Sequence, residues 1–180
     1  MKKTTLWVAR TAVLLAVLLV LQFVTKPLGQ FVTGSCVNLV LAVAALCGGL
    51  WCGVVVAALS PFFAFLLQIA PMPILLVPGV ACGNLVLVLV LYFAAYRLVG
   101  GAGKTALRYA AAVGAAAAKF ATLWLVVTKL LIPLAGLPEQ KAAAMTATFT
   151  WPQLVTALIG GLVGVSIAPV IRRAVDRRGA

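Results

Sequence analysis

The chain alternates between long apolar runs and short polar segments that contain glycine or proline. A helix needs about 20 apolar residues, within a range of roughly 17 to 25, to cross a bilayer. The apolar runs cover approximately residues 4–24, 35–48, 51–68, 77–97, 106–131 and 149–171. The pattern predicts an all-α integral membrane protein, in which residues 1–180 form a single transmembrane domain of six helices.

Residues 36–67 can be interpreted as one span or as two. As a single helix rising 1.5 Å per residue, this segment would be roughly 48 Å long, which is more than one crossing requires. Gly48, Gly49 and Gly53 allow a tight turn in its middle. We therefore expect two spans here, separated near residues 48–51.

The basic residues indicate how the spans are oriented. Cytoplasmic loops of membrane proteins carry an excess of lysine and arginine. With six spans and a cytoplasmic N-terminus, the residues that fall inside are Lys2, Lys3, Arg10, Arg97, Lys104, Arg108, Arg172, Arg173, Arg177 and Arg178, and those outside are Lys26, Lys129 and Lys141. With five spans, the loop that contains Arg97, Lys104 and Arg108 and the arginine-rich C-terminal segment would both face out. We predict six spans with both ends cytoplasmic.

Composition argues against catalysis within the chain. Hydrophobic residues make up 65% and charged residues 9% of the sequence, against about 25% charged residues in ordinary soluble domains. Histidine is absent, and the acidic residues are Glu139 and Asp176. A carboxylate pair, a histidine relay and a His/carboxylate metal site are therefore unavailable. We expect no enzymatic activity, no metal and no cofactor.

Two other features invite a functional interpretation that the sequence does not support. The segment VGGAGKTAL at 99–107 looks like the end of a phosphate-binding loop, but the motif requires glycine at 98, where Leu98 stands. If ATP drives this protein, we expect another subunit to hydrolyse it. The net charge of +12 belongs to residues that flank apolar segments, so we expect contact with a lipid bilayer and not with nucleic acid.

Isolated polar residues gather in the outer half of the predicted spans. The hexads CVNLVL and CGNLVL bring Asn38 and Asn84 into outer helix turns at similar depth, and Gln153 and Thr156 lie in the outer turns of the last span. Either asparagine can serve as a hydrogen-bonded link between helices or as a ligand contact. The polar residues therefore predict a site that opens outward.

Lys119 stands in the apolar run AAAAKFATLWLVV at 115–127. A lysine at the centre of a span costs at least about 2.5–3.5 kcal/mol, and no span contains an acid to offset it. Lys119, Thr122 and Lys129 follow at i, i+3 and i+10, which predicts one stripe from mid-membrane to the outer surface. We interpret Lys119 as functional. The alternative is a structural lysine bonded to carbonyl oxygens or extended along a wet groove.

The outer segments complete a candidate pocket. Segments 25–35 and 68–79 are shaped by glycine and proline, and Trp151 provides either an aromatic face or an interfacial anchor. The expected substrate-binding residues are Lys119, Asn84, Gln153, Asn38, Thr122, Trp151, Thr156 and Gln68. A pocket with a cation, several amides and no acid favours a small anion that has hydrogen-bonding edges.

Small residues predict surfaces on which helices approach closely. They include Ala9, Ala12 and Ala16 in the first span, AAAVGAAAA at 110–118, and Gly160 and Gly164 in the last span. The cytoplasmic half of the domain thus has surfaces for packing or docking, while the outer half has the polar groups.

Together with a length of 180 residues, the Ala-x-x-x-Ala at Ala12 and Ala16 and the segment WPQLVTALIGG at 151–161 make the chain similar to one family. It resembles the substrate-specific S component of an energy-coupling factor (ECF) transporter, the bacterial vitamin-uptake class. The resemblance implies a multi-pass protein of the bacterial cytoplasmic membrane that works with a transmembrane coupling protein and two ABC ATPases. It also implies that Ala12 and Ala16 face the coupling protein and that a vitamin-like substrate binds near the outer surface.

The sequence is also compatible with two other classes of membrane protein. A six-span scaffold protein of cell-wall morphogenesis would use the small-residue faces for its partners and leave Lys119 structural. A small stand-alone carrier is the other alternative. It has less support, because no span holds a carboxylate to couple protons or sodium and the two halves show no convincing inverted repeat.

Overall fold

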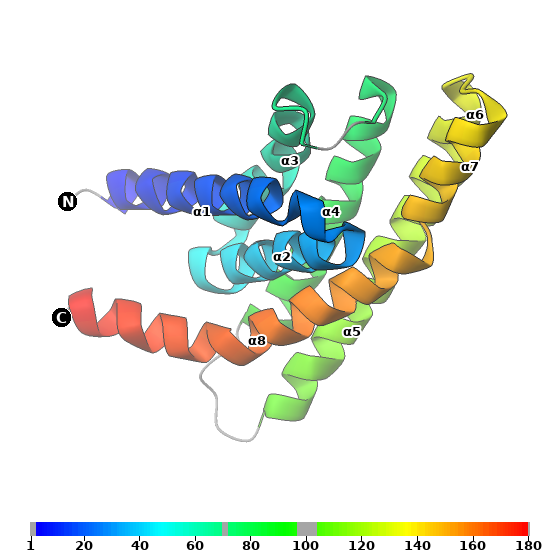
Figure 1. Ribbon diagram of the computed structural model, residues 1–180. Helices are drawn as coiled ribbons and strands as arrows, with labels where there is room; N and C mark the ends of the chain where they lie inside the picture. The colour runs from blue at the N-terminus through cyan, green and yellow to red at the C-terminus, as the bar shows by residue number, and fades with distance from the viewer. Residues whose placement is uncertain (1–2, 70–71, 97–103, 180) are drawn as a thin grey trace.

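The computed structural model describes residues 3–69, 72–96 and 104–179, and within these ranges it contains helices and no strand (Figure 1). The elements in chain order are α1 (Lys3–Thr25), η1 (Lys26–Leu28), α2 (Gln30–Val43), η2 (Ala44–Gly48), α3 (Leu50–Leu66), η3 (Ile74–Leu76), α4 (Val77–Ala95), α5 (Thr105–Thr122), η5 (Leu123–Leu131), α6 (Ile132–Leu134), α7 (Glu139–Thr148) and α8 (Trp151–Gly179). The predicted all-α architecture is confirmed. Most of the glycine-rich segment 99–107 lies outside the described residues.

Six apolar helical stretches overlap the predicted segments, although the second begins earlier, at Gln30, within the expected outer segment 25–35, and the last begins at Glu139. Five of them are long and apolar enough to cross a membrane, namely Thr4–Leu28, Gln30–Gly48, Ile74–Ala95, Thr105–Leu134 and Glu139–Val175. The remaining stretch, α3, is apolar and 17 residues long, at the lower limit of roughly 17 to 25 residues for a span. The cytoplasmic placement of both chain ends stays a prediction.

The expected division of residues 36–67 is present. The second apolar stretch ends in the π-helical turn η2, and α3 begins directly after Gly49. Gly49 has a φ of +88°, in the region that glycine adopts without the steric cost of a side chain. A single residue therefore separates the two helices and allows the chain to change direction between them.

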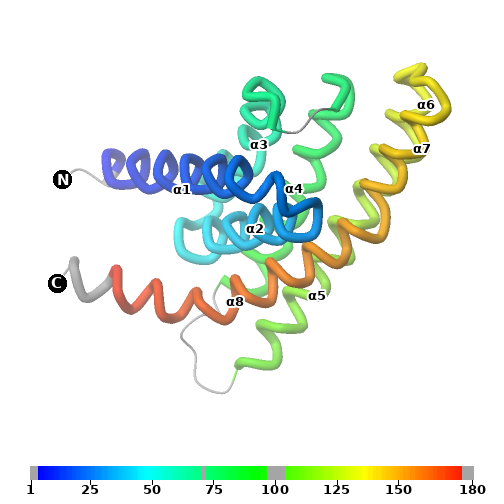
Figure 2. Tube along the Cα trace, viewed as in Figure 1, coloured from blue at the N-terminus to red at the C-terminus, as the bar shows by residue number. Residues whose placement is uncertain are grey.

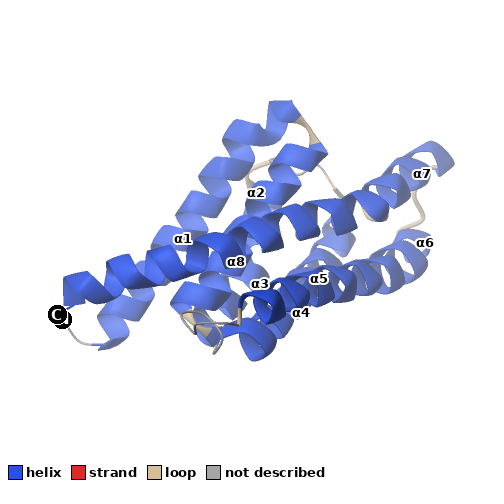
Figure 3. Cartoon of the chain, turned by 90° about the horizontal axis from the view of Figure 1, so that it is seen from below, coloured by secondary structure: helices blue, strands red, loops and turns tan. Residues whose placement is uncertain are grey.

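The helices form one bundle with α1 beginning and α8 ending at the same end of it (Figures 1 and 2). Helix α2 packs along α8, α4 packs between α3 and α5, and α1 packs against α2 and α3. The short helices α6 and α7 lie at the opposite end of the bundle from the end of α8 (Figures 1 and 3). Neither short helix was anticipated from the hydrophobic pattern, which assigned no element to residues 132–148.

Two apolar clusters make up the core. The larger cluster contains residues of α1, α2, α3, α4, α5 and α8, and Ala115 and Ala116 belong to it. The smaller contains Leu123 and Val127 of the π-helical η5, with Leu76, Ile132 and Phe149. Lys119 lies on α5 between the residues that belong to the two clusters. The polar site is therefore placed at the junction of two apolar cores.

Close packing of α2 against α8 depends on Gly160. A methyl group at Gly160 would lie 2.5 Å from the Ser35 carbonyl oxygen and 2.6 Å from Asn38 Cβ, whereas one at Gly161 would meet only Ala112, at 3.7 Å. Overpacking of this kind costs typically 1–3 kcal/mol. We expect Gly160→Ala to lower the melting temperature of the purified protein in detergent, and Gly161→Ala to leave it nearly unchanged. Equal melting temperatures for the two variants would contradict this packing.

Candidate functional site

A cavity of about 310 Å³ lies among the helix ends remote from the start of α1 and the end of α8. Its polar lining residues are Gln22, Lys26, Gln30, Thr33, Asn38, Ser60, Asn84, Lys119, Thr148 and Gln153. Its apolar lining residues include Val37, Ile69, Met72, Val80, Met145 and Phe149. Small-molecule sites span roughly 300–1,000 Å³, so the cavity suits a small ligand with both polar and apolar parts.

Lys119 is held by the two asparagines of the repeated hexads. Its ammonium donates hydrogen bonds to Asn38 Oδ1 at 2.6 Å and to Asn84 Oδ1 at 2.7 Å. The three side chains are 1–3% exposed. An ammonium has three N–H donors, and these two bonds use two of them. The third remains for a group that enters the cavity.

A second network orients Asn38. Its Nδ2 donates to the Gly34 carbonyl oxygen at 2.8 Å and to Thr156 Oγ1 at 3.3 Å. Thr156 is fully buried and is not among the residues that line the cavity. Because Nδ2 is engaged in this way, the Asn38 carbonyl oxygen faces Lys119. Thr156 therefore positions Asn38.

Lys26 lines the cavity from the turn between α1 and α2. Its ammonium donates a hydrogen bond to the backbone carbonyl oxygen of Gln68 at 2.8 Å, which links this turn to the end of α3. Gln68 has a φ of +54°, and its side chain donates to the Phe65 carbonyl oxygen. The expected site residue Gln68 thus contacts a cavity residue through its backbone.

The cavity lining contains two ammonium groups and no carboxylate. Glu139 is exposed in the first turn of α7 and does not line the cavity. Among the described residues, no cluster of three or more histidine, cysteine, aspartate or glutamate side chains could hold a metal ion. The described charges near the cavity therefore favour a negatively charged group.

The predicted stripe of Lys119, Thr122 and Lys129 does not form along the cavity. Lys119 lines it, whereas Thr122 donates to the Ala118 carbonyl oxygen and Lys129 lies over the Trp124 ring at 5.1 Å. From Leu123 to Leu131 the helix is π-helical, and its i→i+5 hydrogen bonds turn the chain less per residue than an α-helix does. The projection at α-helical pitch was therefore wrong for Lys129, whereas Thr122 still belongs to α5 and is half-buried outside the cavity lining.

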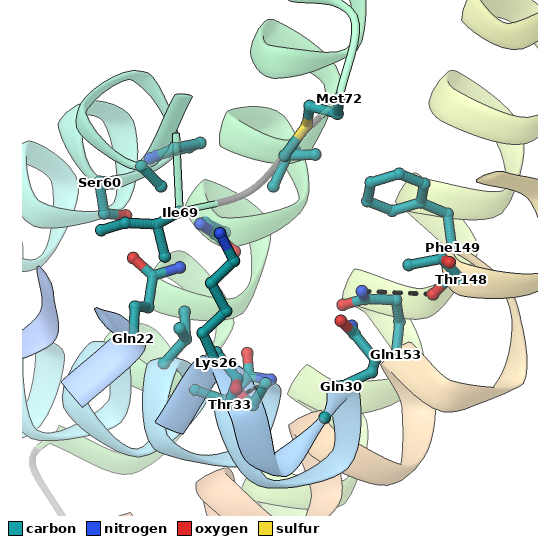
Figure 4. Close-up of a pocket in the computed structure, with 18 of the residues that line it drawn as sticks. Gln22, Lys26, Gln30, Thr33, Ser60, Ile69, Met72, Thr148, Phe149 and Gln153 are labelled. Carbon is teal, nitrogen blue, oxygen red and sulfur yellow. Dashed lines mark hydrogen bonds between the residues drawn. The ribbon is translucent and has the colours of Figure 1, made fainter. Parts of the chain in front are cut away.

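The other expected residues divide between the cavity and its surroundings. Gln153 lines the cavity, and its Nε2 donates to the Thr148 carbonyl oxygen at 3.4 Å (Figure 4). Trp151 is 60% exposed and packs against Phe31, with ring centroids 5.4 Å apart. Trp151 is not among the lining residues.

Several lining residues were not anticipated from the sequence. Gln22 and Ser60 form part of one side of the cavity, and Gln30 and Thr148 lie on the other (Figure 4). A signal was present for two of them, because Gln22 is an amide in the last turns of an apolar helix and Ser60 precedes a proline inside an apolar run. Neither signal specifies that the two residues share a wall.

A separate surface carries the small residues of α1. Ala9, Ala12 and Ala16 are exposed on this helix, while Thr11 and Leu18 are buried. At 3.6 residues per turn, the three alanines share one face, opposite the buried one. The face is free in this chain to contact lipid or a partner.

Comparison with known proteins identifies the family. The protein-family model described as "ECF transporter, substrate-specific component" matches residues 7–172 of the chain. No curated protein and no solved structure matches the chain. The matched region includes the cavity residues, the alanines at 9, 12 and 16, and all or most of each described apolar helix. The chain therefore belongs to the family of substrate-specific components of ECF transporters.

Proposed function

We propose that the chain captures a small, anionic, vitamin-like molecule from outside the bacterial plasma membrane and delivers it for import with a coupling protein and two ABC ATPases. Family membership supports the transport role and the association with a coupling module. It also favours this role over that of a membrane scaffold. The choice of an anion is carried by Lys119, a buried ammonium that lines the cavity beside two amide oxygens.

Lys119 can bind an anion without losing its present partners. The ammonium keeps its bonds to Asn38 and Asn84 and has one N–H left for the ligand. Hydrogen bonds to charged groups contribute roughly 1.5–3 kcal/mol each, so a carboxylate at this position would add substantially to affinity.

The placement of the cavity fits uptake from outside. The chain begins and ends at one end of the bundle, and the basic residues of the ends favour the cytoplasmic side. The cavity lies among the opposite helix ends, where Lys26 and the α7 region flank it. A ligand would enter from the outer surface and stop at Lys119.

The test of this function is uptake by reconstituted liposomes. The purified chain alone is expected to bind ligand but give no uptake, because Glu139, the carboxylate within these described spans, is exposed at the start of α7 and does not line the cavity, where it could couple an ion gradient. Addition of the coupling protein, the ATPases and ATP should produce uptake. Robust, protonophore-sensitive uptake by the chain alone would instead identify a stand-alone carrier.

A further inference from the structure

One wall of the cavity carries buried oxygen atoms that lack a hydrogen-bond partner. Ser60 Oγ and Gln22 Oε1 are buried, and neither has a partner among the described residues. Ser60 is 1% exposed, and both residues line the cavity. Figure 4 shows them on the same side of the cavity, away from Gln30 and Gln153. Buried polar groups are nearly always hydrogen-bonded in folded proteins, so this wall is suited to a partner that enters the cavity.

The Ser60 hydroxyl differs from six other helical hydroxyl groups of the described residues and shares its lack of a partner with Thr128 Oγ1, which does not line the cavity. A serine or threonine inside a helix commonly donates to the carbonyl oxygen four residues earlier. The residues that do so are Thr11, Thr25, Ser35, Thr122, Thr148 and Ser166. Ser60 makes no such bond to Val56 within the described structure. Its hydroxyl is therefore left for a group outside its own helix.

None of the described residues around these oxygens donates a hydrogen bond to them. The adjoining lining residues Pro61, Ala64 and Ile69 have apolar side chains. Lys26, which Figure 4 shows near Gln22, directs its ammonium to the Gln68 carbonyl oxygen. A ligand with an N–H or O–H group would satisfy this wall.

We infer that Gln22 and Ser60 form a second polar subsite, which accepts hydrogen bonds from a donor group on the ligand. The inference rests on the proposed function, because it takes Lys119 as the site of the ligand's anionic group. Ile69, Met72 and Phe149 provide apolar lining for a carbon skeleton. The substrate class is thus a small carboxylate that carries an N–H or O–H group on its far side.

Substituted benzoates test this subsite in the purified full chain. Calorimetry compares benzoate with 3- and 4-hydroxybenzoate and with the two corresponding methoxybenzoates, in which the donor is methylated. At least one hydroxybenzoate is expected to bind about threefold to tenfold more tightly than benzoate. The gain should vanish in its methyl ether.

Substitutions of Gln22 and Ser60 test whether these residues cause the higher affinity for the hydroxybenzoate. Ser60→Ala and Gln22→Leu should each reduce the preference for the hydroxybenzoate over benzoate, and benzoate binding that persists in them shows that the variants are folded. Gln140→Leu, at an exposed glutamine of α7 that does not line the cavity, is the matched control and should keep the preference. The inference is overturned if the wild type shows no preference for a hydroxybenzoate, or if the preference survives in both wall variants. In either case, benzoate binding that depends on Lys119 would still support the proposed function. Benzoate binding that is absent, or unaffected by Lys119→Met, contradicts both.

Discussion

Replacement of Lys119 by methionine is expected to weaken binding of the anionic ligand by about tenfold to a hundredfold. The substitution removes the ammonium that has one N–H free for the ligand, and a charge-assisted hydrogen bond of this kind is worth roughly 1.5–3 kcal/mol. Calorimetry of the purified protein in detergent, with the tightest-binding carboxylate among the water-soluble vitamins, measures the change.

The effect of Lys119→Met on stability should be smaller than its effect on binding. The variant leaves Asn38 Oδ1 and Asn84 Oδ1 without their donor, which costs about 1–3 kcal/mol for each group. It also removes a buried ammonium, whose cost within a span is at least about 2.5–3.5 kcal/mol. Because these contributions oppose each other, the variant should remain folded.

Lys129→Met is the matched control for this change. Lys129 lies on the same continuous helix, is exposed and contacts the Trp124 ring, away from the cavity. The Lys129→Met variant loses the same charge as Lys119→Met. Because this charge lies outside the cavity, the ligand affinity of the variant should match that of the wild type. Equal affinities for the wild type and Lys119→Met would mean that Lys119 has a structural role.

A tryptophan at Ala12 or Ala16 is expected to abolish ATP-driven uptake without changing ligand affinity. Both alanines are exposed on α1, and close approach of a partner helix requires small side chains at such positions. Neither residue lines the cavity. Uptake is measured in liposomes that contain the coupling protein and the ATPases, and affinity is measured on the isolated chain.

Val17→Trp is the control for this docking face. Val17 is 43% exposed and lies about 100° around the helix from Ala16, at 3.6 residues per turn. It adds similar bulk at the side of the alanine face and should retain more uptake than Ala16→Trp. Parallel losses of affinity and uptake in the alanine variants would indicate that Ala12 and Ala16 serve internal packing.

The proximity of Lys119, Asn38 and Asn84 could be predicted because its signals are local. Lys119 is a single cation in an apolar run, and the repeated hexads bring Asn38 and Asn84 to similar depth in two helices. Depth along the membrane follows from residue counting once the spans are known. The structure joins the three side chains in one hydrogen-bonded group.

The course of the helix after Lys119 could not be predicted in the same way. The π-helical segment LWLVVTKLL contains neither glycine nor proline, so no residue type marks the change from α-helical pitch. That change moves Lys129 away from the cavity and onto Trp124. Helical phase over more than two turns therefore depends on tertiary packing.

Contacts between distant helices account for the other differences. The wall of Gln22 and Ser60 exists because α1 packs against α3. Arg172, which the sequence suggested only as a marker of orientation, donates to the carbonyl oxygens of Leu46 and Tyr96 at 2.6 and 3.2 Å. It thereby joins the ends of two other helices to α8, a role that residue spacing does not reveal.

The most direct test of an anion-binding cavity is a thermal-shift screen of the purified chain against water-soluble vitamins, with nicotinate and nicotinamide as a matched acid and amide. We expect the strongest stabilisation from a carboxylate, a larger shift with an acid than with its amide, and loss of that shift in Lys119→Met. Strongest stabilisation by a cation such as thiamine, or a carboxylate shift that persists in Lys119→Met, would contradict the proposed role of Lys119.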